Sequence, residues 1–229
     1  MKITTRFVLG VLVTLTFARL SIAQREMGMR PPSIAGVFNP TVGSGATYDI
    51  ATKNGTKMAM DIAVVDKESG GYWLEISMQM PQTNANSRMQ MNGPSYYKEL
   101  LVRQGDDLIV QRIIVQMPGR PPMDLSSMAH AMQSQESKAD VRANAENMGT
   151  EAVITPAGTF TCQHWHNAKD GEDYWISDKV TPWQLVKMAG TNKDSIILTK
   201  VITGAKTHIT ETPVSIREMM QQHMGRPNQ

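Results

Sequence analysis

Cysteine is almost absent from this chain of 229 residues, because Cys162 is the only one. A single cysteine excludes an intramolecular disulfide, so the fold depends on its apolar core. Long apolar runs are also missing after residue 23, since no later stretch reaches the roughly 18 residues needed to cross a bilayer. The composition, with 41% hydrophobic and 19% charged residues, is typical of a globular protein and excludes a disordered chain.

Residues 1–23 have the organisation of a secretory signal peptide. Two basic residues precede the apolar run 7–17, and Ser21-Ile22-Ala23 provides the small residues of a cleavage site. The next residue is Gln24, whereas direct lipidation needs a cysteine there. We therefore expect cleavage after Ala23 and a mature protein that is periplasmic or secreted and does not span the membrane.

The mature chain also lacks an excess of charge of either sign. The full sequence has 23 basic and 21 acidic residues, a formal net charge of +2. Three of the basic residues belong to the leader, so 20 basic and 21 acidic residues remain, with a net charge of −1. Without a basic surplus the chain has little means of releasing counterions from phosphates, and nucleic acid is excluded as a partner.

The mature chain divides into an arm and a single domain. Residues 24–45 are rich in proline, glycine and polar residues without a sustained period, which predicts a flexible arm. Over 46–229, short runs of alternating apolar residues are separated by turn signals, a pattern typical of antiparallel strands. The expected strands are 46–52, 56–65, 72–80, 96–103, 108–117, 150–155, 159–167, 172–177, 184–188, 195–202 and 205–211.

Two helices are expected beside these strands. Leu125, Met128 and Met132 recur at helical spacing, which predicts a short helix inserted within 121–147. A Ser215-x-x-Glu218 capping box predicts a C-terminal helix. Because no βαβ alternation is present, the predicted fold class is mainly β, with about eleven strands in an antiparallel sheet or open barrel.

Methionine is abundant, and two neighbouring strands place it on one face. The alternation puts Met58, Met60, Ile62 and Val64 on the same side, and the next strand continues this surface with Leu74, Ile76, Met78 and Met80. The flexible thioether side chain suits a cavity that accepts ligands of varied shape, and it suits an irregular core equally. Thioethers at this spacing are also ligands for copper(I).

Two later segments resemble exported bacterial proteins of the LolA-like superfamily. They are Gly158-Thr-Phe-Thr-Cys162 and the run Tyr174-Trp-Ile-Ser-Asp-Lys-Val-Thr-Pro-Trp-Gln-Leu-Val-Lys-Met188, and the resemblance is strongest over 151–213. It implies an incomplete antiparallel half-barrel curled around helices, whose concave apolar face holds acyl chains in better-known members. The motifs are structural and carry no catalytic residue. The high methionine content and the His-rich strand depart from the lipoprotein-carrier members.

The His-rich strand contains a candidate metal site. Cys162, His164 and His166 alternate along it and project from one face, so they are candidate ligands for zinc or copper, with His208 as a further ligand. In the competing interpretation, Cys162 is a small buried apolar residue beside Phe160, and the two histidines emerge toward solvent.

Enzymatic chemistry finds little support in the sequence. There is no Gly-x-Ser-x-Gly elbow, and the apolar context of Cys162 predicts an inert thiol, so we expect no catalysis and no cofactor. The leading hypothesis is an exported envelope protein that binds a lipid or an acylated protein in its half-barrel, on the eight residues of the two methionine-rich strands. The alternatives are a periplasmic zinc or copper protein and an envelope interaction module with a filled core.

Overall fold

The computed structural model describes residues 34–52, 55–79, 93–129, 137–191, 194–215 and 218. The chain separates into the units Met1–Ser33 and Ile34–Gln229, and every described residue belongs to the second. The predicted signal peptide and the first part of the predicted arm therefore lie outside the described residues.

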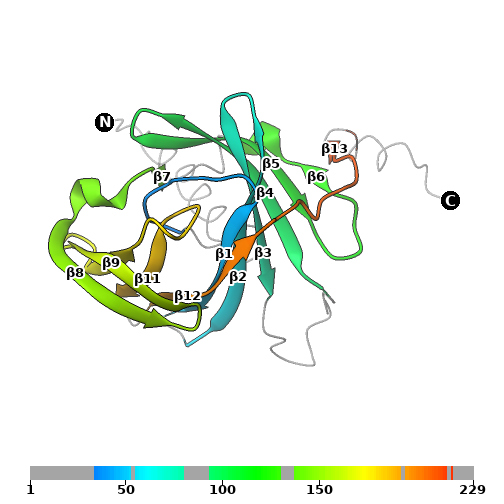
Figure 1. The fold of residues 1–229 in the computed structure, drawn as a ribbon. Helices are drawn as coiled ribbons and strands as arrows, with labels where there is room; N and C mark the ends of the chain where they lie inside the picture. The colour runs from blue at the N-terminus through cyan, green and yellow to red at the C-terminus, as the bar shows by residue number, and fades with distance from the viewer. Residues whose placement is uncertain are drawn as a thin grey trace, which may run out of the picture. The chain divides into compact units, whose positions relative to one another are not determined.

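One sheet organises the described residues (Figure 1). Its longer strands are β1 (Ser44–Ala51), β2 (Lys57–Glu68), β3 (Gly71–Gln79), β4 (Ser95–Gln104), β5 (Asp107–Gln116), β8 (Glu146–Thr155), β9 (Gly158–Asn167), β10 (Glu172–Ile176), β11 (Leu185–Gly190) and β12 (Ser195–Thr203). Three two-residue strands complete it: β6 (Met123–Asp124), β7 (Ser137–Lys138) and β13 (Val214–Ser215).

The strands follow one another in the order β13-β6-β5-β4-β3-β2-β1-β12-β11-β10-β9-β8, and β7 pairs with β5. All neighbours are antiparallel except β13 and β6. The two ends of this order are not paired with each other, so the sheet is open. The prediction of a mainly β, open antiparallel architecture is confirmed at this level.

The predicted helices are not supported. In the inserted region, the described residues form β6, a 3-10 helix over Ser126–Met128 and another over Val141–Asn144, while 130–136 lie outside the described residues. The capping box at Ser215 does form, because the Glu218 carboxylate accepts from the Ser215 backbone N–H at 3.0 Å and Glu218 N–H donates to Ser215 Oγ at 3.2 Å. The residues that would continue that helix are not described.

The core lies on one face of the sheet. Register partners Tyr48, Met60 and Met78 place their side chains there, on β1, β2 and β3. The segment before β1 covers this face with buried side chains at Ile34, Val37 and Phe38, although its composition predicts a flexible arm. Val37 N–H donates to the Trp183 carbonyl at 2.8 Å, which ties the segment down.

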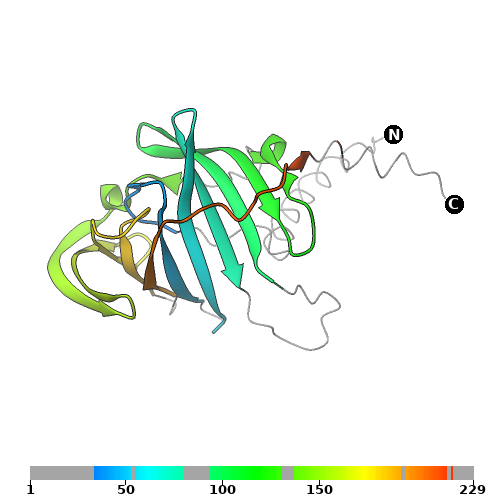
Figure 2. The same cartoon turned by 45° about the vertical axis from the view of Figure 1, so that its right-hand side comes forward.

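The expected strand 205–211 is not a strand. Residues 204–209, here called the strap, leave the end of β12 and cross the face of the sheet opposite the core (Figure 2). The strap backbone forms no strand ladder: Ala205 N–H donates to the Gly43 carbonyl at 2.8 Å, just before β1, and His208 N–H donates to Glu75 Oε1 at 2.9 Å. Ile209 is buried there in a second apolar cluster with Trp73, Leu100 and Ile114.

Candidate functional site

The methionine-rich face proposed from the sequence lies inside the core. Met60, Ile62, Val64, Leu74, Ile76 and Met78 are each between 0 and 7% exposed and belong to one continuous cluster. Met58 is partly buried against this cluster, whereas Met80 lies outside the described residues. In the described state these side chains contact protein rather than solvent.

Aromatic residues close the same face. The Phe38 ring lies 4.9 Å from the Trp183 ring and 6.4 Å from the Tyr72 ring, measured between centroids. The indole N–H groups of Trp183 and Trp165 are buried, and neither has a hydrogen-bond partner among the residues that the structure describes. An unsatisfied buried N–H is costly, so these two donors are unusual polar groups in an apolar environment.

Cys162 is a free thiol buried in the core. It is 1% exposed, and its thiol donates to the Phe160 carbonyl at 3.6 Å. Burial, helped by the nearby Glu151 charge, raises the pKa of the thiol to about 11. A thiol of this pKa is protonated at neutral pH, which makes it a poor nucleophile and a poor metal ligand.

His164 and His166 bind a carboxylate instead of converging on Cys162. His164 Nε2 and His166 Nδ1 lie 2.9 and 3.0 Å from Asp173 Oδ1. His164 Nδ1 also lies 3.5 Å from Glu151 Oε1, and its ring stacks on Trp175 at 4.5 Å between centroids. Partial burial works against ionisation of Asp173, but the hydrogen bonds from the two imidazoles prevail and lower its pKa.

The fourth candidate ligand, His208, occupies a different site. Its Nδ1 lies 2.7 Å from Glu75 Oε1, and its ring stacks on Tyr96 at 4.7 Å between centroids. The four residues predicted as metal ligands are thus divided among the core, the β9–β10 pair and the strap. Among the described residues, no group of three or more histidine, cysteine or acidic side chains is arranged to hold a metal ion.

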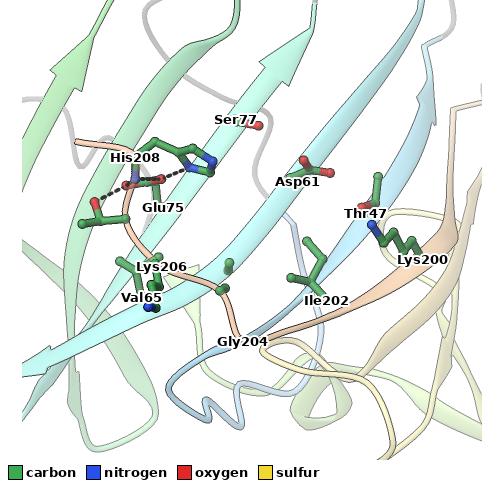
Figure 3. Close-up of a pocket in the computed structure, with 13 residues that line it drawn as sticks. Thr47, Asp61, Val65, Glu75, Ser77, Lys200, Ile202, Gly204, Lys206 and His208 are labelled. Atoms are coloured by element: carbon green, nitrogen blue, oxygen red, sulfur yellow. Dashed lines mark hydrogen bonds and ion pairs between the residues drawn. The ribbon is translucent and has the colours of Figure 1, made fainter. Parts of the chain in front are cut away.

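A hollow of about 440 Å³, here called the strap groove, lies between the strap and the sheet (Figure 3). Its lining includes Ala63 on β2, whose register partner on β1 is Gly45. A Cβ added at Gly45 would approach the Ile62 carbonyl oxygen to 2.3 Å and the Ala63 Cβ to 2.8 Å, so β1 and β2 lie too close together at this point for a side chain on Gly45.

Glu75 fixes the strap at one end of the groove. Its side chain is 3% exposed, and its carboxylate accepts from Thr207 Oγ1 at 2.5 Å in addition to the two groups of His208. These charge-assisted bonds compensate the burial of the carboxylate. The strap is therefore held by a specific polar contact as well as by the burial of Ile209.

A row of polar side chains forms the open side of the strap groove. Lys200, Thr47, Asp61 and Ser77 are register partners on β12, β1, β2 and β3, and all four line the hollow. Asp61 and Lys200 are exposed, and neither forms a hydrogen bond or ion pair within the described part of the chain. The groove thus presents the carboxylate of Asp61 and the ammonium group of Lys200 on either side of the Thr47 hydroxyl, and the exposed Lys206 of the strap adds a second ammonium group to the lining.

Sequence reasoning did not find this site. The outward residues of β1 to β3 carry the polar half of the alternation, and the sequence analysis predicted no site on that face. The signal available was the buried Glu75 in the middle of an apolar run, but its partners Thr207 and His208 follow it by 132 and 133 positions. A contact at that separation leaves no local pattern.

Comparison with known proteins finds similarity only at the level of solved structures. No protein-family model and no curated protein matches the chain. Among solved structures, it is similar to a protein from Bacteroides fragilis described as exported, with a YmcC-like fold, at 14% identity and a TM-score of 0.31, over 73% of this chain and 99% of that one. It is also similar to a protein from Parabacteroides distasonis described as a lipoprotein, at 16% identity and a TM-score of 0.31, over 74% and 100%.

At this TM-score, neither structure supports a conclusion about this chain. The LolA-like resemblance and the cleavage after Ala23 stay predictions. No helix in the described ranges is long and apolar enough to cross a membrane.

Proposed function

We propose that the chain is an exported, non-catalytic binding protein that takes a small zwitterion in the strap groove. The observation that carries this proposal is the pair of unpaired, opposite charges on Asp61 and Lys200 beside a hollow. A ligand with a free ammonium and a free carboxylate, such as an amino acid or a short peptide, complements both.

The spacing of the two charges suits such a ligand. β1 separates β2 from β12, so the Cα atoms of Asp61 and Lys200 lie about 9–10 Å apart, twice the distance between neighbouring strands. Two charge-assisted hydrogen bonds of about 2.8 Å leave room for a short zwitterion between the flexible side chains. The hydroxyls of Thr47 and Ser77 offer further donors and acceptors along the same row.

The test is calorimetric titration of the full chain with diglycine. We expect binding to wild type and a loss of about tenfold or more in each of Asp61→Asn and Lys200→Gln, because each change removes one charge-assisted hydrogen bond. Lys57→Gln is the matched control, since Lys57 is exposed at the start of β2 and does not line the groove. N-acetylglycine amide, which lacks both charges, should not bind.

Two results would contradict the proposal. If wild type does not bind diglycine at millimolar concentration, the strap groove is not a site for zwitterions. Equal binding of diglycine and its blocked analogue would show that the charges of Asp61 and Lys200 are not recognised.

A second candidate function, binding of an apolar ligand at the methionine-rich face, is favoured by the unpartnered indole N–H groups of Trp165 and Trp183. A lipid carboxyl group would satisfy such donors, and the segment Ile34–Phe38 would have to move to admit its acyl chain. The variant Met60→Glu distinguishes an apolar binding cavity from a filled core. If the variant no longer binds a fluorescent fatty acid but keeps the melting temperature of wild type, the result supports a cavity. If wild type binds no fatty acid and the variant unfolds, the result supports a filled core, because a carboxylate buried there is costly.

A further inference from the structure

β8 is the last strand at one end of the sheet (Figure 1). It pairs with β9 on one side and is the last strand in the order, so no described strand is hydrogen-bonded to its other edge. Every residue of Glu146–Ala152 is exposed, and Ile154 is 80% exposed. An unpaired edge of this length presents a row of N–H and C=O groups that are available to another strand.

The exposed face of the β8–β9 hairpin carries no charge. It consists of three register pairs in which all six residues are exposed: Thr150 with Gln163, Ala152 with Thr161, and Ile154 with Thr159. The opposite face is fixed to the body, because Val153, Phe160 and Cys162 are buried in the core cluster. The hairpin therefore presents an uncharged surface, with four β-branched residues of the six, next to its unpaired edge.

The regular part of the edge is short and well defined. A register shift between Asn147 and Gly149 interrupts the ladder, and Gly149 N–H donates to Asn147 Oδ1 at 2.8 Å. Pro156 follows the strand at its other end. The regular stretch is thus Gly149–Thr155, with Ala152 at its centre, and it contains neither lysine nor proline, the residues that commonly protect an edge from pairing.

We propose that a second copy of this chain adds its β8 to this edge, antiparallel, with the two-fold axis at Ala152. In this register Thr150 lies opposite the partner's Ile154, and Glu151 lies opposite the partner's Val153. Ala152 meets the partner's Ala152 at the axis, where small side chains allow the strands to approach. β-branched pairs are thus formed, and no like charges oppose each other.

The self-complementary register is what favours a second copy over an unrelated extended peptide. Moving the axis by one residue to Glu151 would set two carboxylates directly against each other, which is destabilising. The axis at Ala152 avoids this and coincides with the middle of the regular edge. The proposal does not depend on the strap groove, which lies on other strands.

Cysteine cross-linking of the full chain tests the register. A residue meets its own copy only at a two-fold axis, so Ala152→Cys should form an intermolecular disulfide on mild oxidation, visible as a dimer on a non-reducing gel. Val42→Cys is the matched control, because Val42 is 50% exposed and lies outside the hairpin. The native Cys162 is 1% exposed and should leave wild type uncross-linked.

Sedimentation as a function of concentration tests the association itself. Ala152→Lys places two positive charges at the axis and should weaken dimerisation by about tenfold or more, while the melting temperature of the monomer stays near that of wild type because Ala152 is exposed. A chain that stays monomeric to millimolar concentration, equal cross-linking of the two cysteine variants, or an undiminished dimer in Ala152→Lys would each overturn the proposal. The first outcome would leave an extended peptide of another protein as the occupant of the edge.

Discussion

At the scale of single residues, Asp173 links His164 and His166 through its carboxylate. Its carboxylate accepts from both imidazoles, and those hydrogen bonds hold its pKa below the ordinary value despite partial burial. Because the folded-state pKa is lower than the unfolded value of about 3.9, the contribution of Asp173 to stability is present above that value. It is lost as the pH falls through the folded-state pKa.

Asp173→Asn should therefore reduce stability at pH 7 and flatten the decline of the melting temperature between pH 5 and pH 3. Asparagine still accepts one hydrogen bond but has no proton to take up, so its contribution does not change over this range. Thermal melting across the pH series is the measurement, with Asp178→Asn, at an exposed turn position, as the control for loss of one carboxylate. If the melting temperature of Asp173→Asn falls with pH in parallel with that of wild type, the hydrogen bonds from His164 and His166 do not stabilise the Asp173 carboxylate.

At the scale of elements, the strap is held to the outer side of the sheet by Glu75. Removing this carboxylate leaves the Thr207 and His208 donors without their partner, and the cost of such a loss is about 1–3 kcal/mol. His208 is largely exposed, so water replaces part of what is lost.

Glu75→Ala should thus open the strap more than it destabilises the whole fold. Trypsin cleavage after Lys206, which is exposed in the strap, should become faster, and exchange of the His208 amide hydrogen should increase. Glu75→Gln, which retains one oxygen acceptor, should give an intermediate rate. Asp66→Ala, at an exposed position of β2, controls for removal of an acidic side chain. Equal cleavage rates in all four proteins would mean that Glu75 does not anchor the strap.

The strands could be predicted from the sequence because a half-buried strand repeats every two residues, as Met58 to Val64 do. The strap was mistaken for a strand for a related reason. Its backbone is held by a bond to Glu75 and by the burial of Ile209 in the outer cluster, and neither contact is local. Tertiary contacts of this kind override local pattern, and they also form the strap groove on a face for which the sequence analysis predicted no site.

At the scale of the whole molecule, the sequence could not distinguish a cavity from a filled core. The alternation places Met60 and Ile76 on one face in both cases. The difference lies in Ile34–Phe38, which belongs to the proline- and glycine-rich stretch 24–45 predicted to be an arm but places its side chains in the core. The backbone of this segment is bonded to other loops, as Phe38 N–H donates to the Ala139 carbonyl at 2.7 Å, and such pairings have no signature in the sequence.

Phe38 is the residue with which this segment closes the core. It is 6% exposed, contacts the rings of Tyr72 and Trp183, and accepts a hydrogen bond at its carbonyl from Arg103 at 3.1 Å. Phe38→Ala retains the backbone bonds but removes the ring, and a phenylalanine-to-alanine change in a core costs about 3–5 kcal/mol. Denaturant unfolding should show this loss.

The same variant should expose the methionine-rich face, so binding of an apolar fluorescent dye to the native state should increase. Asn39→Ala is the control, because the Asn39 side chain is exposed and its backbone N–H keeps its bond to the Pro182 carbonyl at 2.7 Å. If Phe38→Ala unfolds at the same denaturant concentration as wild type and binds no more dye, the segment does not close the core. Lower stability with greater dye binding would identify Ile34–Phe38 as the part of the molecule that separates its apolar interior from solvent.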